Sequence, residues 1–329
     1  MLKMTAISNG GSYSNYMTGA EGQKADYYMQ SEELKRAPEW VGEGAKELGL
    51  QGEVKTADLQ AVLAGNLPNG EQLGRAAGDG QTEHRAGWDG TFSAPKSVSV
   101  AALVGGDQRL SDAHATAVRE ALQHIEKHKL ETRVTTGGVT QREQTGSMVA
   151  AVFQHAASRA SDPQLHSHAL IANATKGQDG KWRSVESLSI YQDIKGLGQV
   201  YRETLAREVM AAGYEINQQK DGSFEIRGVP GHVIDQFSKR SEAIERDLAS
   251  KGLDRDSAKG AEKDLAALET RSAKAGVPAA ELEERWRKES LSVGFDAVKF
   301  VQQAREQATP ERREQIMAER EKAAADAVK

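Results

Sequence analysis

Three of the eight histidines lie within fourteen residues of one another, and their spacing could build a metal site. His166 and His168 are two residues apart in an apolar segment typical of a β-strand, so their side chains point to the same face of a sheet. His155 ends the preceding predicted strand, and the Ser-Asp-Pro at residues 161–163 indicates a turn between the two. If these strands pair as antiparallel neighbours, the three imidazoles converge on one point.

Three neutral imidazoles with open coordination positions make a catalytic metal site, whereas structural sites are usually closed by four ligands. The chain has no cysteine, so any metal must be held by His, Asp or Glu. All-nitrogen ligation suits Zn, Ni, Co or Cu by intrinsic affinity, and Mg or Mn needs a hard oxygen ligand such as a phosphate. The alternative is that each histidine is a hydrogen-bonded polar group of a half-buried sheet. Convergence of three favours the metal.

Four of the seven tyrosines form a second cluster near the start of the chain, at Tyr13, Tyr16, Tyr27 and Tyr28. Their neighbours are Gly, Ser, Asn and Asp, which argues against packing in a core. A phenol, with a free pKa of about 10, can act as a nucleophile once its proton is removed. Exposed aromatic rings also stack on the bases of single-stranded DNA. The cluster by itself does not decide between these two roles.

Asp89 precedes the predicted strand residues Thr91 to Ser93. Ligating histidines usually donate their second ring N–H to a carboxylate or carbonyl, and Asp89 could accept that bond. It could also accept a proton from a tyrosine. A plain turn aspartate before Gly90 is the simplest interpretation from the residues alone.

The composition sets wider limits. A chain of 329 residues can bury a real core, as one large domain or two modest ones. No stretch approaches the roughly 18 apolar residues of a membrane helix, and residues 1–6 carry no export signal, so we expect a cytoplasmic protein without membrane insertion. The net charge of -5 argues mildly against a nucleic-acid partner, although only the local charge of a groove matters.

Local patterns predict an α+β protein. Helices are expected over residues 40–48, 57–64 and 193–212, and from about residue 111 onward. Strands are expected over residues 90–104, 130–136, 145–155 and 165–175, with a hairpin of 214–218 and 223–227. Beyond Phe237 the chain is charged and mostly helical, and Thr309-Pro310 opens a final helix. That helix ends without a glycine stop, so we expect the natural protein to continue beyond Lys329.

The candidate residues belong to longer motifs that occur in a fixed order. These are Asn15-Tyr16, Asp26-Tyr27-Tyr28, Trp40-Val41-Gly42-Glu43-Gly44-Ala45, Leu48-Gly49-Leu50, Trp88-Asp89-Gly90-Thr91-Phe92-Ser93-Ala94-Pro95-Lys96-Ser97-Val98-Ser99, Phe153-Gln154-His155, Pro163-Gln164-Leu165-His166-Ser167-His168 and Phe237-Ser238-Lys239-Arg240-Ser241. Together they resemble the MobF class of conjugative relaxases, of the TraI and TrwC type, over about residues 1–300.

The resemblance implies the HUH-type relaxase fold, in which a central antiparallel sheet is flanked by helices. Residues 1–236 would form the catalytic core, and residues 237–329 a mostly helical part that closes over DNA. Full-length relatives carry a helicase after the relaxase, so the chain would be part of a longer relaxase-helicase. It contains no G-x-x-x-x-G-K-[ST] phosphate loop, and no ATPase is expected within it.

The resemblance also assigns roles. His155, His166 and His168 would hold one divalent metal ion, Mg or Mn in the cell, with Zn, Ni or Co as alternatives. Tyr16 would be the nucleophile, and Asp89 would activate it or orient a histidine. Either Tyr27 or Tyr28 would act in a second strand transfer. Many members of the class have a second tyrosine directly after the first, whereas Met17 stands here, so Tyr13 remains a weaker candidate.

The implied activity is nicking and rejoining of one DNA strand at a plasmid origin of transfer, through a 5′-phosphotyrosine intermediate. Implied partners are single-stranded origin DNA with an adjacent hairpin, relaxosome accessory proteins and the coupling protein, and the protein could enter the recipient cell bound to DNA. Lys96, Arg159, Lys239 and Arg240 are the expected DNA contacts. The alternatives are a replication initiator or transposase of the same superfamily, a metal-dependent nuclease that uses water, and a non-catalytic DNA-binding module.

Overall fold

The computed structural model describes residues 2–7, 36–76, 82–270, 277–311, 314–315 and 318. The chain forms two compact units, each assembled from separate segments. The first unit contains residues up to 93, 113–155 and 166–205, and the second contains 94–112, 156–165 and 206 onward. The division after residue 236 that the sequence suggests stays a prediction.

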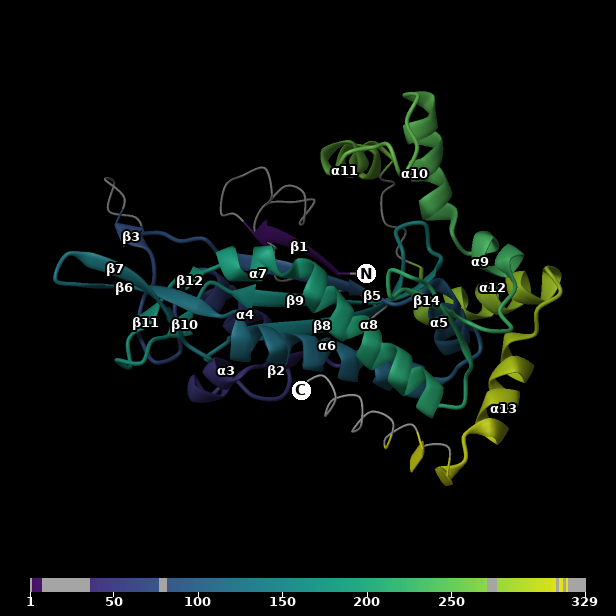
Figure 1. Ribbon diagram of the computed structural model, residues 1–329, viewed down its shortest axis with the longest axis horizontal. Helices are drawn as coiled ribbons and strands as arrows, with labels where there is room; N and C mark the ends of the chain where they lie inside the picture. Colours follow the sequence, from purple (N-terminus) through teal and green to yellow (C-terminus); the bar gives the residue numbers. More distant parts are fainter. Residues whose placement is uncertain are drawn as a thin grey trace. The chain divides into compact units, whose positions relative to one another are not determined.

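A five-stranded sheet forms the centre of the first unit, in the order β1 (Leu2–Ile7), β5 (Gly87–Ser93), β9 (Pro163–Ala172), β8 (Ala150–Ala157) and β2 (Glu39–Val41) (Figure 1). The pairs β1–β5, β5–β9 and β2–β8 are antiparallel. Strands β8 and β9 also run antiparallel, because Ser158 N–H donates to Asp162 O near their turn and Ala172 N–H donates to Val149 O at the far end. The predicted central antiparallel sheet and the predicted pairing of these two strands are confirmed.

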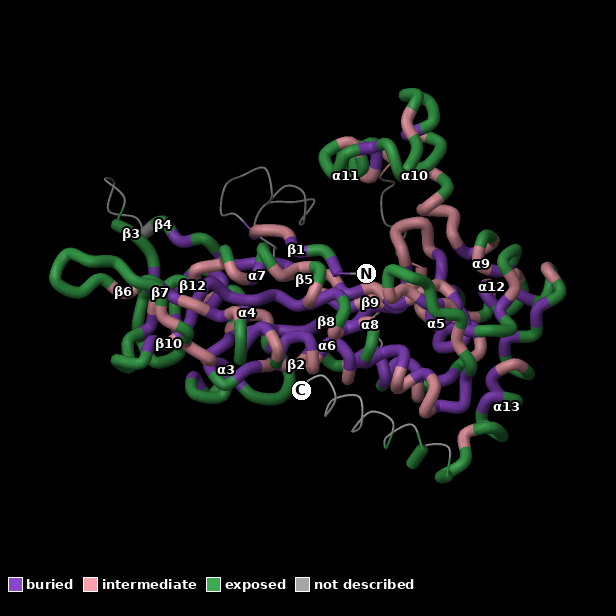
Figure 2. The backbone as a smooth tube through the Cα atoms, in the orientation of Figure 1, coloured by how far each residue is buried: buried purple, intermediate pink, exposed green. Residues whose placement is uncertain are grey.

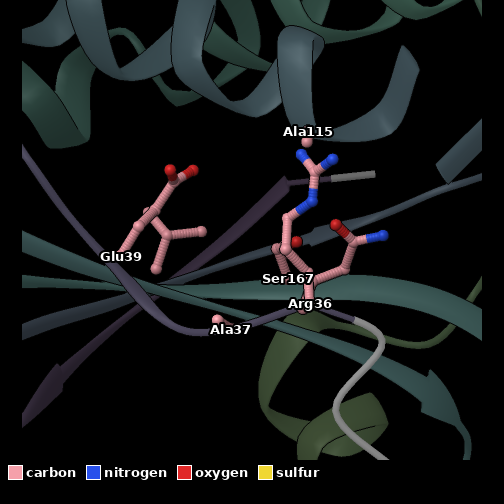
Figure 3. A pocket seen from close by; sticks show the side chains of 7 residues that line it. Arg36, Ala37, Glu39, Ala115 and Ser167 are labelled. Atoms are coloured by element: carbon pink, nitrogen blue, oxygen red, sulfur yellow. The ribbon is translucent and has the colours of Figure 1, made fainter. Parts of the chain in front are cut away.

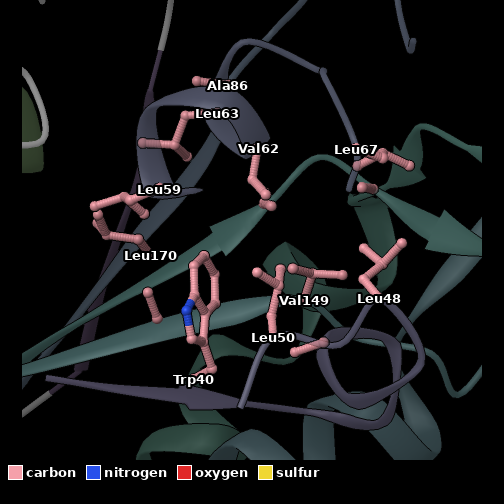
Figure 4. Close-up of a cluster of buried hydrophobic side chains, with 14 of the residues drawn as sticks. Trp40, Leu48, Leu50, Leu59, Val62, Leu63, Leu67, Ala86, Val149 and Leu170 are labelled. Atoms are coloured by element: carbon pink, nitrogen blue, oxygen red, sulfur yellow. The ribbon is translucent and has the colours of Figure 1, made fainter. Parts of the chain in front are cut away.

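One face of this sheet carries both the histidines and an apolar core farther along the same strands. Because side chains alternate along a strand, Leu170 and Ala172 share the face of His166 and His168. Helices α3 (Glu43–Glu47) and α4 (Thr56–Leu63) contribute to this core. Figure 4 shows its side chains, with Trp40 beside Leu170 and Leu59, Val62 and Leu63 of α4 above them.

Two long helices, α6 (Gln108–His128) and α8 (Ile194–Ala211), cover the opposite face (Figure 1). Each buries a stripe of residues at helical spacing. These stripes include Ala117, Val118, Ala121, Leu122 and Ile125 on α6, and Leu197, Tyr201 and Leu205 on α8. Figure 2 shows the central strands mostly buried, as expected for a sheet with a helical layer on one face and a core on the other. The half-buried positions of β9 are Gln164, His166 and His168.

Smaller elements complete the first unit. They are β3 (Arg75–Ala76) paired with β4 (Thr82–Glu83), β10 (Thr175–Lys176) with β11 (Trp182–Arg183), the sheet of β12 (Val185–Glu186), β6 (Glu131–Thr136) and β7 (Val139–Gln144), and helix α7 (Leu188–Gln192).

The second unit is mostly helical. It contains α5 (Lys96–Ser99), the π-helix η1 (Val100–Val104), β13 (Ile216–Gln218), β14 (Phe224–Ile226), α9 (Gly231–Gln236), α10 (Lys239–Ser250), α11 (Gly260–Glu269), α12 (Ala279–Ser292) and α13 (Ala297–Gln307). The predicted hairpin around Asp221-Gly222 and the helical character beyond Phe237 are confirmed. The described residues from Pro310 onward are helical, as predicted. No helix of the described parts of the chain is both long and apolar enough to span a membrane.

The prediction of a strand over residues 90–104 is wrong beyond Ser93. Residues 96–104 form α5 and η1, and the alternation at 97–100 reflects polar contacts of the two serines. Ser97 Oγ accepts the N–H of Ile226 at 2.7 Å, and Ser99 Oγ donates to the Pro95 carbonyl at 3.1 Å. A short buried run is compatible with either helix or strand, and periodicity alone does not separate them.

The predicted helix over residues 40–48 is wrong at its start. Residues 39–41 are strand β2, paired with β8, and the helix begins only at Glu43. Gly42 separates the two with φ of 109°, and a Cβ there would lie 2.2 Å from the Met148 carbonyl oxygen. Only glycine can make this change of direction against the neighbouring strand.

Candidate metal centre

The three histidines of the sheet face form one cluster. His166 and His168 come from β9 and His155 from β8, and the available ligand atoms of the three lie within 4.8 Å of one another. Their ring centroids are 5.3 to 5.4 Å apart. His155 is buried and the other two are half-buried. The predicted convergence is therefore confirmed, and the donor set is that of a three-imidazole metal site.

The turn between β8 and β9 keeps the strands in register. Ser158 N–H donates to Asp162 O, and Ser158 Oγ accepts the N–H groups of Ala160 and Asp162. Ser161 adopts φ of 57°, the left-handed conformation of a tight turn. Because side chains alternate on each strand, this register determines which histidines share a face.

Asp89 lies in the middle of β5, so the interpretation as a turn aspartate is wrong. It sits beside the histidines because Thr91, two residues on, pairs with His168 across β5 and β9. The carboxylate oxygens of Asp89 lie 2.9 and 3.0 Å from Nδ1 of His168, and the side chain is almost fully buried. Thr91 Oγ1 lies 3.4 Å from the same nitrogen. A carboxylate can only accept, so Nδ1 carries the proton and Nε2 keeps its lone pair for a metal.

The cluster fits a divalent ion by its chemistry. Three nitrogens supply part of a coordination shell and leave positions for substrate oxygens, which is typical of catalytic sites. The carboxylate behind one imidazole is the usual outer partner of a ligating histidine. Among the residues that the structure describes, no other group of three or more His, Asp and Glu side chains could hold a metal.

A buried histidine that sequence reasoning missed lies behind the cluster, on the other face of β9. His114 of α6 has Nε2 2.8 Å from Ser167 Oγ and Nδ1 2.8 Å from the Tyr201 hydroxyl. A signal was available, because positions 114, 118, 121 and 125 fall on one helical stripe and the other three are apolar. A histidine on such a stripe must find buried partners.

The residues expected to contact DNA are mostly engaged with protein groups. Lys96 Nζ donates to the Pro163 carbonyl at 2.9 Å, and burial lowers its pKa to about 8. Lys239 pairs with Glu289 at 3.0 Å. Arg240 donates to the carbonyl oxygens of Thr270 and Ala267, and Arg159 is half-buried. The DNA-binding roles of these four residues stay predictions.

A pocket in the first unit has a basic and aromatic lining that sequence reasoning did not single out. The arginines and tryptophans that line it are Arg75, Arg85, Arg133, Arg183, Trp88 and Trp182. Two of the guanidinium groups are paired within the pocket region, Arg133 with Glu186 and Arg183 with Asp179. Trp88 and Trp182 are only 2% and 7% exposed, so their rings are packed within the protein and are not available to stack on a base. The guanidinium groups are the part of this lining that suits phosphates.

The tyrosine cluster, Tyr13, Tyr16, Tyr27 and Tyr28, lies outside the described residues. The roles assigned to these tyrosines stay predictions.

A family model described as TrwC relaxase matches residues 10–293, most of the chain. The chain belongs to the TrwC relaxase family. The multifunctional conjugation protein TraI of Escherichia coli (strain K12) is 38% identical over 306 residues, which cover 90% of this chain. The chain spans only 16% of the length of that curated relative.

Solved structures of the relaxase TrwC share this fold. A metal-bound TrwC complex with oriT DNA is 37% identical, with a TM-score of 0.82, and the match covers 90% of this chain and 100% of that one. TrwC complexed with a 27-mer DNA comprising the recognition hairpin and the cleavage site is 36% identical, with a TM-score of 0.80 over 90% of this chain and 100% of that one. The relaxase fold and the family that the sequence motifs suggested are both confirmed.

Proposed function

We propose that this chain nicks and rejoins one strand of DNA at an origin of transfer, through a tyrosine and one divalent metal ion. The observation that carries the proposal is the histidine cluster with Asp89 behind His168, in a chain that matches the TrwC relaxase family over residues 10–293. The complexes of TrwC with oriT DNA, with a bound metal and with the recognition hairpin support the choice of substrate and cofactor.

The histidines would hold the ion, and Asp89 would hold one of them in the correct tautomer. Because Asp89 accepts from Nδ1 of His168, the Nε2 lone pair stays available, and the ring cannot rotate without losing that bond. A bound divalent ion would supply charge withdrawal from the scissile phosphate. Mg or Mn is the proposed ion in the cell, because the DNA phosphate adds the hard oxygen ligand that these ions need. Zn, Ni and Co remain alternatives.

Tyr16 is the proposed nucleophile. Its phenol oxygen forms a bond to phosphorus, the bond to the 3′ oxygen breaks, and the 3′-hydroxyl leaves with a proton while the 5′-phosphate stays on the tyrosine. This ester conserves the energy of the phosphodiester, so the 3′-hydroxyl can reverse the step without ATP. Tyr27 or Tyr28 would accept the strand in a second transfer that ends the cycle.

The DNA would be held by phosphate contacts outside the metal centre. The arginines of the pocket in the first unit would contact phosphates of the DNA, and Lys96, Arg159, Lys239 and Arg240 are further proposed contacts. We propose that the protein acts in the donor cytoplasm with relaxosome accessory proteins and the coupling protein, and that it can enter the recipient attached to DNA. The helical part beyond residue 236 is proposed to close over the substrate.

The test is trapping of the covalent intermediate. The protein is incubated with a single-stranded oligonucleotide carrying its cognate transfer origin, with Mg or Mn or with EDTA, and run on a denaturing protein gel. Wild type should form a metal-dependent adduct that Tyr16→Phe loses. Tyr191→Phe is the matched control, because Tyr191 is an exposed tyrosine of α7 and should leave the adduct unchanged.

Other outcomes are equally informative. An adduct that survives in Tyr16→Phe would move the nucleophile to Tyr13, Tyr27 or Tyr28. Cleavage without any adduct would overturn the tyrosine mechanism in favour of a nuclease that uses water. Tight, chelator-insensitive binding without cleavage would indicate a DNA-binding module, and cleavage only at replication origins would indicate an initiator.

A further inference from the structure

The residue between the two ligand-bearing positions of β9 faces away from the metal centre. Ser167 points to the helical layer, because His166 and His168 occupy the alternate positions of the strand, and it is 1% exposed. Any movement of this residue changes the directions of both neighbouring imidazoles. What holds Ser167 therefore influences the geometry of the metal centre.

A chain of three polar side chains holds it. His114 bridges Ser167 and Tyr201 through its two ring nitrogens, with both distances 2.8 Å. The Tyr201 ring packs edge-on against His114, with centroids 5.6 Å apart, and also against Phe92 at 5.3 Å. Phe92 is the partner of Ser167 in the β5–β9 register. The network thus connects α6 and α8 to the strand that carries His166 and His168.

Ser167, His114 and Tyr201 satisfy one another's hydrogen-bonding groups while all three side chains are neutral. A neutral imidazole has one donor and one acceptor, and two hydroxyl groups satisfy both in either tautomer. Burial, with smaller contributions from the nearby His166 and Arg36, lowers the pKa of His114 to about 3. Burial also raises the pKa of Tyr201, which stays a neutral phenol. Figure 3 shows the small pocket beside Ser167, with the Arg36 side chain pointing toward Ala115, the residue that follows His114.

Removing one member leaves buried polar groups without partners. Ser167, His114 and Tyr201 are each at most 1% exposed, so water cannot replace the lost bond without local rearrangement. Because β9 is paired on both sides, the loss would act as a small change of direction at Ser167, and such a change would turn the two histidines on the opposite face. A metal site tolerates errors of only about 0.5 Å and 10–20° in its ligands.

We propose that His114 is a positioning residue of the metal centre, which fixes the strand segment carrying His166 and His168 through its bonds to Ser167 and Tyr201. The inference rests on the proposed metal site. It goes beyond that site by assigning part of the metal affinity to a side chain on the opposite face of the sheet.

The test compares metal affinity with stability. His114→Leu, His114→Gln, Ser167→Ala and Tyr201→Phe are purified without metal and titrated with Mn²⁺ and Ni²⁺ by calorimetry, in the absence of DNA. Unfolding in urea is followed in parallel. We expect His114→Leu and Ser167→Ala to lose less than about tenfold in metal affinity, because the range of about 10–100-fold applies to groups bonded directly to a ligating histidine. His114→Gln should recover part of the loss, because its amide can both donate and accept.

A matched control separates positioning from general loss of packing. Thr204 of α8 donates to Glu120 of α6 at 2.8 Å and is equally buried, but this bond does not involve β9. Thr204→Val should lower the urea midpoint while leaving the metal affinity unchanged. The double variant His114→Leu with Ser167→Ala should lose no more affinity than either single change, since both break the same connection.

The outcomes distinguish this inference from the proposed function. Wild-type metal affinity in folded His114→Leu and Ser167→Ala would overturn the positioning role and leave the metal centre intact. Absence of Ni²⁺ binding by the wild type would overturn both, because Ni²⁺ suits imidazole ligands without an oxygen from DNA. If His114→Leu does not fold, Ser167→Ala and Tyr201→Phe test the positioning role instead, because each removes only one hydroxyl group together with its hydrogen bond to His114.

Discussion

Replacing Asp89 by asparagine tests the role of the carboxylate behind His168. Asp89→Asn keeps the size of the side chain and an oxygen that can accept from Nδ1, but it removes the negative charge. The imidazolium-like character of a metal-bound ring makes its Nδ1–H a stronger donor, so the carboxylate bond is stronger in the metal-bound state than in the free protein. The substitution should therefore weaken metal binding more than it weakens the fold.

The size of the effect follows from the geometry. Both carboxylate oxygens lie within 3.0 Å of Nδ1, and Asp89 is 4% exposed, so solvent screens the interaction little. Loss of an outer-sphere partner typically reduces metal affinity by about 10–100-fold, or about 1.4–2.7 kcal/mol. We expect Asp89→Asn to lie near the lower end of this range and Asp89→Ala near the upper end, since alanine also removes the acceptor.

Calorimetric titration with Mn²⁺ and Ni²⁺ measures the affinity, and urea unfolding without metal measures the fold. Asp107→Asn provides the control, because Asp107 is a fully buried aspartate bonded to Arg109 and Tyr214. It should lose stability and keep its metal affinity. Equal metal affinities for wild type and both Asp89 variants would refute the argument that this carboxylate supports the ligand.

Three further changes test the packing around the site. Gly87→Ala should lower the free energy of unfolding, measured in urea, by about 1–3 kcal/mol, because Gly87 has φ of 143° and a Cβ would lie 2.0 Å from a carbonyl oxygen of β9. Gly90→Ala, with its nearest atoms at 3.5 Å, should cost much less. Tyr214→Phe removes a 2.7 Å bond to the Asp107 carboxylate and should cost about 1.5–3 kcal/mol in urea unfolding at neutral pH. Burial alone would raise the pKa of Asp107, but the bonds from its partners hold this pKa below the ordinary 3.8. The stabilisation is therefore present above pH 3.8 and is lost as the pH falls through the lower pKa of the folded state. The difference in unfolding free energy between wild type and Tyr214→Phe should accordingly become smaller in acid. Trp286→Phe removes the indole bond to the carbonyl in the β8–β9 turn and part of a fully buried ring, so it should cost more than the hydrogen bond alone, which is worth about 0.5–1.5 kcal/mol. An unchanged free energy of unfolding would mean that neither contact stabilises the turn.

The sequence predicted the features that depend on nearby residues. The histidine cluster forms within one hairpin, so strand alternation and a turn were sufficient to bring its members together. Helix α8 was predicted to within a residue at each end, because its apolar stripe is long and a glycine follows it.

Features that depend on packing between distant segments were not predictable. From the residues alone Asp89 looked like a turn aspartate, and only the family resemblance suggested that it orients a histidine, because its contact with His168 depends on the register of β5 against β9. The apolar stripe of α6 indicates that His114 is buried, but its bond to Ser167 joins residues 53 apart in the chain. In the helix at residues 96–104, Ser97 bonds to distant residues, because its N–H donates to Glu225 and its hydroxyl accepts the N–H of Ile226. None of these contacts leaves a local pattern in the sequence.

The placement of the ligands on one hairpin has a consequence for folding kinetics. Hairpins form in about 1–10 μs, whereas contacts between distant segments form more slowly. The donor nitrogens of β8 and β9 can therefore gather before β5 brings in Asp89, which is 79 residues from His168 in the chain. An ion bound at that stage would act as a template for the central strands. We expect a divalent metal that is present from the start of refolding to increase the refolding rate. Metal added after folding is complete should lower the unfolding rate and leave the refolding rate unchanged.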